Sequence, residues 1–365
     1  MKVLHLSAVK NWGGGENHLE NLCYELRNDV LNFIFCVKGS LLHERLKLRK
    51  EPVFAAPLAN KMDPRYIRKL IQVCKKEHFD LIHIHDSTAL TLAVMADHFT
   101  ELPPFIMSKK TSFPIRPRRQ TLYKYNYPKL REILCVSEAT KAVSSMTLNG
   151  DKTLKVIYHG TRIDNKASET PFKLRDKCGI PSEKKIIGNI ANHIEAKHLE
   201  TFIQTADQLI NKGKRTDFHF VQIGNFSKRT QGLKDLVARL QLQEHFSFLG
   251  YISEASNFIP QFDLMLITSE SEGIPQAIYE SFYHEVPVVS TAVGGIPEVI
   301  KHNENGLLSP AYDHENLTEN ILFLMENPQL ITTFAKISRE KLLNNFTTEI
   351  MARETLKRYK NVING

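Results

Sequence analysis

Short apolar runs alternate with amphipathic stretches along this sequence, and the alternation occurs in two successive series. The first begins with Lys2–Ser7, which predicts a buried strand, followed by Glu16–Arg27, whose leucines share one helical face. The second begins with Lys185–Ile190 and Leu199–Lys212 in the same roles. Strands that alternate with helices form parallel sheets covered by those helices. We therefore expect an α/β protein with two Rossmann-like, doubly wound parallel-sheet domains facing a cleft lined by the carboxyl ends of the strands.

The domain boundary follows from the same patterns. At 365 residues the chain has room for two domains. Between the two series, the polar and proline-containing segment 165–171 loses periodicity and predicts the connection. Further strands are expected at 32–37, 81–85, 105–108 and 132–137 in the first series, and at 217–223, 247–248, 264–268 and 286–290 in the second. The domains then comprise residues 1–165 and 166–345, and a helical C-terminal stretch follows at 346–365.

Composition narrows the partners and the compartment. Lys and Arg number 48 against 40 Asp and Glu, a net charge of +8 that suits phosphate-bearing partners or an anionic membrane surface. The five cysteines are scattered without a C-x-x-C pair, so neither a zinc site nor a disulfide framework is expected. Reduced thiols indicate a cytoplasmic protein. No apolar stretch approaches the roughly 18 residues of a spanning helix.

Two carboxylates flank the most informative loop of the sequence. After the expected strand at 264–268 come Glu272 and Gly273, then a helix expected to begin near Pro275, with Glu280 on it. The free N–H groups at a helix start attract anions and hydroxyl oxygens. Glu272 and Glu280 could therefore clamp two hydroxyl-bearing parts of one ligand. Taken alone, the pair would more often be two solvated glutamates.

The residues around this pair carry a family resemblance. The Glu272 to Glu280 spacing is followed by Pro287–Val289 and Val293–Glu298. This pattern resembles the retaining glycosyltransferases of family four (glycosyl transferases group 1), a group that includes many bacterial lipopolysaccharide and cell-envelope enzymes. The resemblance extends to Gly13–Glu16, Val136–Glu138, Val156–Gly160, Lys197, Phe248–Gly250 and Asp263. It implies the GT-B architecture, with an N-terminal acceptor domain, a C-terminal donor domain, and the last helix crossing back to the first domain.

The resemblance assigns the donor site. It implies that Glu272 meets the donor sugar and that Glu280 holds the ribose hydroxyls of the nucleotide. Lys197 would neutralise the leaving diphosphate together with Asn192, which stands where an Arg is more common; His193 or His198 could compensate, or be ordinary surface histidines. The remaining donor contacts are expected at Gly14, Gly15, Gly250, Gly273, Ile274, Pro275 and Gln276, mostly through backbone N–H groups, although Pro275 has none to donate.

The acceptor site is less closely defined. Trp12 and Glu16 flank the Gly13–Gly15 loop, and Trp12 could touch an acceptor or simply cover the loop. Lys110 stands where many relatives place a catalytic His, so we expect it to be catalytic. Lys109 is expected to bind the acceptor, the alternative being that both lysines are solvated at a strand end. His85 could reach an acceptor from its strand end, although a structural role is the plainer interpretation.

The stretch Lys109–Arg131 is rich in basic and aromatic side chains. Such a surface suits anionic lipid headgroups, so we expect peripheral attachment at the inner face of the cell membrane. No nucleic-acid motif accompanies the charge, and no nucleic-acid partner is expected.

The expected function is that of a retaining hexosyltransferase. It would move a sugar from a UDP- or GDP-sugar to a glycan or lipid-linked acceptor in envelope polysaccharide or lipopolysaccharide synthesis. No Asp-x-Asp cluster occurs, so neither a metal nor another cofactor is expected. Two alternatives stay open: a nucleotide-sugar epimerase on the same fold, which would act without an acceptor, and a non-catalytic nucleotide-sugar or glycan binding protein.

Overall fold

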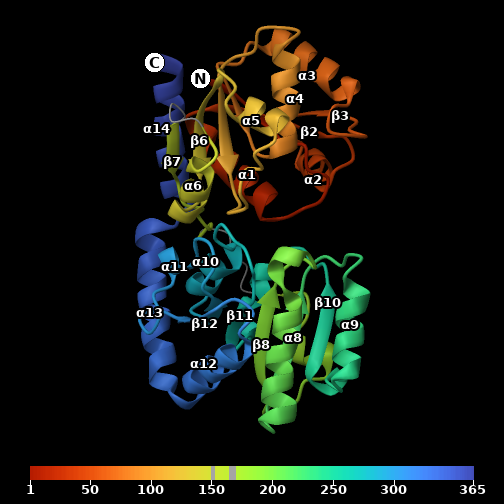
Figure 1. Cartoon of the computed structure of the whole chain (residues 1–365), viewed down its shortest axis with the longest axis vertical. Coiled ribbons are helices and arrows are strands. Elements are labelled where there is room, and N and C mark those ends of the chain that lie inside the picture. Colours follow the sequence, from red (N-terminus) through yellow and green to blue (C-terminus); the bar gives the residue numbers. More distant parts are fainter. Residues whose placement is uncertain (149–152, 164–169) are drawn as a thin grey trace. The chain divides into compact units, whose positions relative to one another are not determined.

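The computed structural model describes residues 1–148, 153–163 and 170–365. They form two compact units, one of Met1–Gly160 with Thr348–Gly365 and the other of Thr161–Thr347. Each unit contains one parallel sheet with helices packed on it (Figure 1). The chain is therefore an α/β protein with two doubly wound domains, as the sequence predicted. The chain leaves the first unit after Gly160 and returns to it at Thr348. These boundaries lie a few residues from the expected 165 and 346.

The first unit has a seven-stranded sheet in the order β3-β2-β1-β4-β5-β6-β7. The order reverses between β1 and β4, which pair in parallel, His5 opposite His83. A reversal of this kind leaves a crevice at the carboxyl ends of the two strands, where such folds bind ligands. The strands are β1 (Lys2–Leu6), β2 (Leu31–Val37), β3 (Val53–Ala56), β4 (Leu81–Ile84), β5 (Phe105–Lys109), β6 (Leu130–Cys135) and β7 (Thr153–Val156).

Helices of the first unit begin at residues suited to cap them. The side chain of Asp63 accepts from Arg65 N, with Pro64 at the first helical position of α3. Asp86 accepts from Thr88 N and Ala89 N at the start of α4. The helices are α1 (Gly14–Glu25), α2 (Leu41–Leu48), α3 (Pro64–Glu77), α4 (Ser87–Asp97), α5 (Arg119–Tyr125), α6 (Glu138–Ser145) and α14 (Thr348–Asn364).

Helix α14 belongs to the first unit although it ends the chain. Its Met351 and Tyr359 pack in one buried cluster with Val3 of β1 and Leu22 of α1. Figure 1 shows α14 in blue beside β7 and α6. Residues more than 300 positions apart thus complete one core, and burial of a large side chain such as Tyr359 stabilises the unit by about 1.5–3 kcal/mol.

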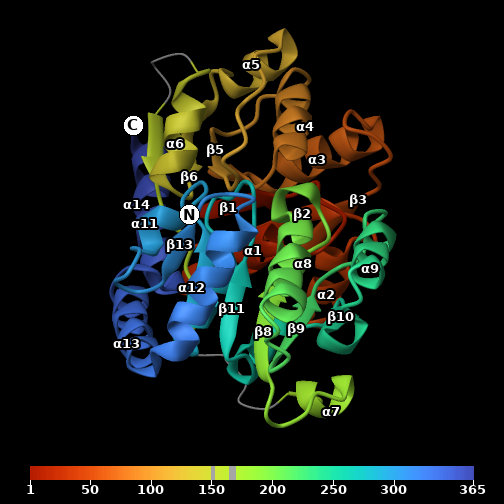
Figure 2. The same ribbon diagram turned by 60° about the horizontal axis from the view of Figure 1, so that its bottom comes forward.

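The second unit has a six-stranded sheet in the order β10-β9-β8-β11-β12-β13, and its order reverses between β8 and β11. The strands are β8 (Lys185–Ile190), β9 (Phe218–Ile223), β10 (Phe246–Gly250), β11 (Leu264–Ile267), β12 (Val288–Thr291) and β13 (Leu307–Ser309). The helices are α7 (Leu174–Cys178), α8 (Leu199–Asp207), α9 (Thr230–Arg239), α10 (Gln276–Tyr283), α11 (Ile296–Val299), α12 (His314–Glu326) and α13 (Pro328–Asn345). Helices α8 and α12 cover one face of the sheet (Figure 2).

Three strands are absent from the sequence prediction: β3, β7 and β13. Each has three or four residues and lies at the edge of its sheet. Edge strands are short and partly exposed, so their apolar pattern is weak. None of the helices within the described ranges combines the length and apolar character needed to cross a bilayer.

Candidate active site

The order reversal of the second sheet brings Lys197 and Glu272 together. Lys197 follows β8 and Glu272 follows β11, the two strands at the reversal. The Lys197 ammonium donates to Glu272 Oε1, and the Ser269 hydroxyl donates to the same oxygen at 2.6 Å. Both side chains retain partial exposure, 22% for Lys197 and 11% for Glu272. One cationic and one anionic group are thus held side by side at the edge where such folds bind ligands.

The start of helix α10 lies next to this pair. The carbonyl oxygen of Gly273 accepts from Gly295 N at 2.8 Å, which ties the loop before the helix to the loop after β12. Pro275 precedes the first helical residue, Gln276, and Glu280 lies four residues further on the same helical face. In the described part of the chain, both polar atoms of the Gln276 amide are buried without a hydrogen-bond partner. A buried amide usually has partners, so the Gln276 amide is an exception beside this pair.

Asn192 connects the neighbouring loops. Its Oδ1 accepts from Asn225 N at 3.0 Å and from Asn225 Nδ2 at 3.1 Å. Gly224 N donates to the Gly250 carbonyl at 2.9 Å. A Cβ on Gly224 would lie 1.8 Å from the Ala191 carbonyl oxygen, so only glycine fits there. The loops after β8 and β9 and the last residue of β10 are therefore linked to one another.

His193 does not supply the missing positive charge. Its ring is buried, with Nδ1 bonded to Thr230 Oγ1 at 2.9 Å and Nε2 to Gln222 Oε1 at 2.7 Å. Burial lowers the pKa of His193 below its ordinary value, so the ring is neutral at neutral pH. Both earlier interpretations of His193, a compensating cation and a surface histidine, are wrong.

The first unit has a matching group of residues at its own order reversal, between β1 and β4. Gly13 caps the start of α1, so Gly14 and Gly15 lie in the first turn of this helix and not in the expected loop, and Asp86 follows β4. Asp86 Oδ2 accepts from Ala8 N at 2.7 Å, while Oδ1 accepts from Thr88 N and Ala89 N. These bonds show that Asp86 fixes the backbone at the reversal.

Lys110 reaches the first turn of α1 from the end of β5. Its Nζ donates to the Gly15 carbonyl at 2.9 Å and to His85 Nδ1 at 3.3 Å. Burial lowers the pKa of Lys110 to about 8, against the opposing effect of the Glu16 and Asp86 charges. Burial likewise raises the pKa of Glu16 above its ordinary value, and the Lys110 charge opposes that shift. Lys110 is thus a largely enclosed cation beside the start of α1.

Lys109, the preceding residue, has a different environment. Its side chain is buried, and its ammonium donates to Thr111 O, to Thr111 Oγ1 at 3.3 Å and to Phe113 O at 3.0 Å. An ammonium has three protons to donate, so these three oxygens occupy it. This geometry argues against the expected contact between Lys109 and an acceptor. It also contradicts the alternative that the two lysines are solvated.

Trp12 is anchored beside the loop. The indole packs against the buried cluster that includes Leu19 and Leu46, and the Arg45 guanidinium lies 4.2 Å from its ring centroid. An arginine over an indole face is a favourable cation–π contact. The described contacts of Trp12 therefore fit its covering role and leave only part of the ring accessible.

A cluster of buried histidines, whose contacts the sequence did not predict, surrounds Lys110. The rings of His83 and His85 stack at 4.2 Å, and His5 stacks on His85 at 5.3 Å. His18 and His159 bond to each other through Nδ1 atoms 2.9 Å apart. The alternation of His5 and Ser7 with apolar residues along β1 and just after it was the available signal, but it did not reveal the partners.

His5, His83 and His85 form the one group among the described residues with the spacing of metal ligands. All six of their ring nitrogens already have hydrogen-bond partners. Those of His83 bond to Tyr359 OH at 2.5 Å and Ser108 Oγ at 2.8 Å. The Lys110 ammonium also stands against His85 and would repel a cation. The residues do not fit a metal site.

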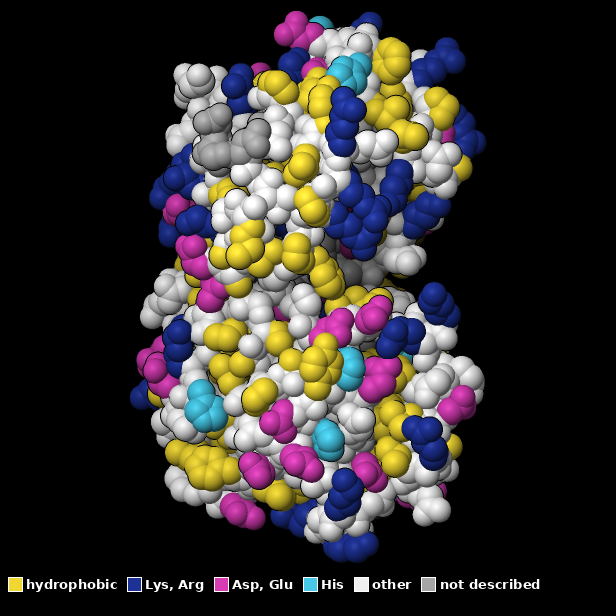
Figure 3. Space-filling view, in the orientation of Figure 1, with side chains coloured by type: hydrophobic (Ala, Val, Ile, Leu, Met, Phe, Trp, Pro, Cys, Tyr) yellow, Lys and Arg dark blue, Asp and Glu magenta, His cyan; other side chains and the backbone are white. Residues whose placement is uncertain are grey.

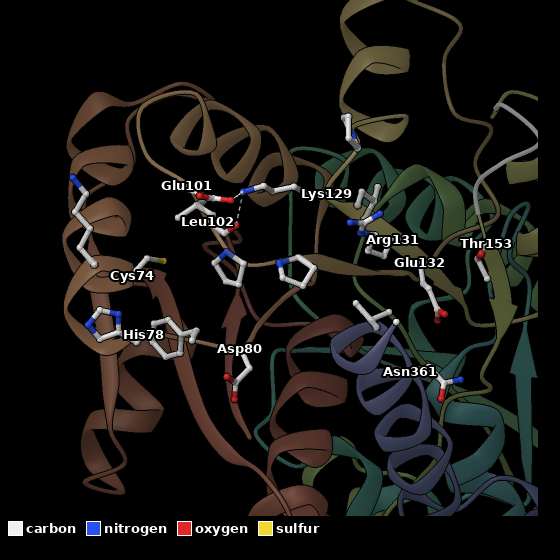
Figure 4. A pocket seen from close by; sticks show the side chains of 18 residues that line it. Cys74, His78, Asp80, Glu101, Leu102, Lys129, Arg131, Glu132, Thr153 and Asn361 are labelled. Carbon is white, nitrogen blue, oxygen red and sulfur yellow. Dashed lines mark hydrogen bonds and ion pairs between the residues drawn. The ribbon is translucent and has the colours of Figure 1, made fainter.

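A hollow of about 1190 Å³ opens elsewhere on the first unit (Figure 4). Its lining includes Asp80, Pro104 and Thr153, which precede or begin β4, β5 and β7. It therefore lies at the amino-terminal edge of the sheet, opposite the edge that carries Lys110. Figure 4 shows Lys129 turned to Glu101 and Leu102 within it. It is not part of the candidate site.

The two parallel-sheet units, each with its polar residues at an order reversal, have the architecture of GT-B glycosyltransferases. Comparison with known proteins gives the family. The model described as Glycosyltransferase Family 4 matches residues 12–165, and the model described as Glycosyl transferases group 1 matches residues 172–341. The chain belongs to this glycosyltransferase family.

Individual relatives agree with the family. The chain is 22% identical over 289 residues to an N-acetyl-alpha-D-glucosaminyl L-malate synthase of Bacillus anthracis, covering 77% of this chain and 74% of that protein. It is 20% identical over 294 residues to a UDP-Gal:alpha-D-GlcNAc-diphosphoundecaprenol alpha-1,3-galactosyltransferase of Escherichia coli, covering 78% and 76%. The crystal structure of HepE from Anabaena in complex with UDP and glucose superposes with a TM-score of 0.86 at 19% identity, covering 99% of this chain and all of that one.

Proposed function

We propose that this chain is a retaining, metal-independent hexosyltransferase. It transfers a sugar from a UDP- or GDP-sugar to a glycan or lipid-linked acceptor in the synthesis of envelope polysaccharide or lipopolysaccharide. The observation that carries the proposal is the meeting of Lys197 and Glu272 at the order reversal of the second sheet, next to the start of α10.

The donor site follows from the chemistry of these groups. A nucleotide diphosphate needs positive charge, which Lys197 and the N–H groups at the start of α10 supply. A sugar offers hydroxyl groups, for which the carboxylate of Glu272 is an acceptor. Glu280 lies one turn into α10, at a position suited to accept from two ribose hydroxyls. Gln276 begins the same helix.

The reaction needs little covalent chemistry from the protein. The acceptor oxygen forms its bond to the anomeric carbon on the face from which the diphosphate leaves. The bond between that carbon and the phosphate oxygen breaks, and the departing phosphate oxygen takes the acceptor proton. Negative charge grows on the diphosphate, so Lys197 stabilises the transition state more than the bound donor. These groups supply the role that a metal ion has in other transferases.

The first unit is proposed to bind the acceptor. Lys110, held at the Gly15 carbonyl, places a positive charge at the carboxyl edge of the first sheet. Glu16, buried beside it, offers a carboxyl group to an acceptor hydroxyl. Lys110 takes the place of a histidine in the family pattern, and its charge favours an acceptor or donor with a phosphate group.

Peripheral attachment to an inner membrane face is part of the proposal. Lys and Arg side chains gather on the first unit in Figure 3. Within the stretch Lys109–Arg131, Lys124 and Lys129 bond to protein oxygens, whereas Arg116, Arg118 and Arg119 are exposed. Each exposed basic residue near an anionic surface contributes about 1 kcal/mol.

One experiment separates this proposal from the alternatives. Purified protein is incubated with UDP- and GDP-sugars, with and without polyprenyl-diphosphate glycans, and the products are followed by NMR, which also reports the anomeric configuration. Transfer with retention in the presence of EDTA is the expected result. Inversion of the anomeric configuration would overturn the retaining mechanism. A requirement for a divalent ion would overturn metal independence. Net epimerisation without acceptor, or donor binding without turnover, would favour the two alternatives.

A further inference from the structure

We propose that His85 and His5 are positioning residues for Lys110. Together with Asn32 they form a hydrogen-bond chain of fixed direction that presents an acceptor nitrogen to the Lys110 ammonium. The chain thereby holds the ammonium where it donates to the Gly15 carbonyl. The proposal rests on the proposed function of Lys110 in sugar transfer, but its test measures the titration of the Lys110 ammonium directly.

The direction of the chain is set at Asn32. The Asn32 Nδ2 group donates to Cys23 O and Val30 O, both at 3.2 Å, which orients the amide. Asn32 Oδ1 therefore faces His5 Nε2, at 3.0 Å. An amide oxygen only accepts, so the proton of the neutral His5 ring must be on Nε2.

The remaining protons follow from that one. His5 Nδ1, without a proton, accepts from His85 Nε2 at 3.0 Å. The proton of the His85 ring is thus on Nε2, and His85 Nδ1 accepts from Lys110 Nζ at 3.3 Å. A single arrangement of protons satisfies every member from Asn32 to Lys110. If either ring changed tautomer, two N–H groups or two lone pairs would face each other.

Both rings remain neutral across the physiological range. Burial lowers the pKa of His5 to about 4 and that of His85 well below its ordinary value, and the Lys110 charge adds to both shifts. The other titratable groups facing this region are Glu16 and His18 from α1, His83 from β4, Asp86 from the loop after β4, and His159 from the loop after β7. The histidines among them are buried with lowered pKa values, so Lys110 is the cation of the group.

A matched pair of variants at His5 tests the chain. Asparagine places its side-chain oxygen near the position of the histidine Nδ1, whereas glutamine places its amide near Nε2. His5→Asn therefore keeps the acceptor for His85 Nε2, and His5→Gln loses it. Without that acceptor, His85 can place its proton on Nδ1 against Lys110. An ammonium facing an N–H group loses its proton more easily.

The measurement is competitive acetylation of lysines with acetic anhydride across pH 6–10, read by mass spectrometry. In His5→Gln we expect the Lys110 titration to move down by about one pH unit, and in His5→Asn to stay within about 0.3 units of the wild type. Lys109 is an internal reference, because its ammonium bonds to Thr111 and Phe113 instead. Equal Lys110 titrations in the Asn and Gln variants would overturn the proposal.

A second pair of variants and a metal-binding measurement complete the test. The pair His85→Asn and His85→Gln applies the same logic at the next ring: Asn keeps the acceptor at Nδ1 and should leave Lys110 unchanged, and Gln should lower its titration. This pair serves if the His5 variants fail to fold. Zn²⁺ is also added to the wild type and to both His5 variants. Stoichiometric binding to the wild type that both variants lose would overturn the proposed hydrogen-bond chain in favour of a metal site. If the titration of Lys110 shifts as expected but transfer activity keeps its pH profile, the hydrogen-bond chain is confirmed and the proposed role of Lys110 in transfer is wrong.

Discussion

Arg358 of α14 holds both carboxylate oxygens of Glu132 on β6, 226 residues earlier in the chain. Its Nε donates to Glu132 Oε2 at 2.7 Å, and its Nη2 donates to Oε1. The exposed fractions of the two side chains are 22% for Arg358 and 7% for Glu132. A two-pronged pair of this kind is geometrically specific as well as strong. It fixes α14 to the first sheet, next to Tyr359 and its bond to His83.

Removing the arginine should destabilise the first unit. Arg358→Ala leaves a buried carboxylate unpaired, and we expect a loss of about 2 kcal/mol in the free energy of unfolding, below the roughly 3–5 kcal/mol for a fully buried pair. Urea denaturation followed by circular dichroism measures it. Arg353→Ala is the control, because Arg353 is largely exposed and lies 3.8 Å from Glu354. Equal stability of the two variants would contradict the prediction.

Glu280→Ala should weaken nucleotide binding. Two ribose hydroxyls would lose a charged acceptor, a loss of about 1.5–3 kcal/mol. Isothermal titration with the free nucleoside diphosphate measures the change in Kd. Glu340→Ala, at an exposed position of α13, should bind as the wild type does. Unchanged affinity in Glu280→Ala would remove Glu280 from the donor site.

Lys197→Ala should lower kcat far more than it weakens acceptor binding. Charge on the leaving diphosphate grows in the transition state, so loss of the ammonium is expected to reduce turnover by about 10²–10³-fold. Initial rates at saturating donor measure the effect. Lys185→Ala is the matched control, since Lys185 begins β8 and pairs with Asp263 at 3.0 Å. Wild-type turnover in Lys197→Ala would make Lys197 an ordinary surface residue.

Transfer activity should fall as the pH rises through the titration of Lys110. Burial lowers the pKa of Lys110 to about 8, and the charged form is the one proposed to act. The ammonium is therefore present below about pH 8 and is lost above it, so kcat/KM should decline on the alkaline side. Lys110→Arg keeps its charge throughout this range and should abolish that decline. A decline that is the same in both proteins would assign it to another group.

Exposed arginines should carry attachment to anionic membranes. Replacing Arg116, Arg118 and Arg119 together with Ala should reduce co-sedimentation with phosphatidylglycerol vesicles and leave donor binding intact. Three basic residues contribute about 3 kcal/mol at such a surface. High salt should also weaken binding, because the Debye length is about 8 Å at physiological ionic strength. Equal and negligible binding of the wild type to anionic and neutral vesicles would refute attachment.

Periodicity in the sequence was enough to predict the two parallel sheets. Central strands such as β1 and β8 are apolar because both of their faces are covered, and the pattern reports that burial directly. The Glu272 to Glu280 spacing and the adjacent glycine turn carried the family, because a helix start next to a strand end is a local feature. The short edge strands β3 and β13 were missed because three or four residues are too few to show a clear apolar pattern.

Tertiary structure decided which polar residues act together. Lys109 and Lys110 are neighbours of the same type, yet one ammonium is enclosed by its own loop and the other reaches Gly15, 95 positions earlier. His5 meets His85 across 80 positions, and Lys197 meets Glu272 across 75. A sequence pattern records whether a side chain is buried. Its partner is set by the order of strands in the sheet, because that order determines which strand ends lie side by side.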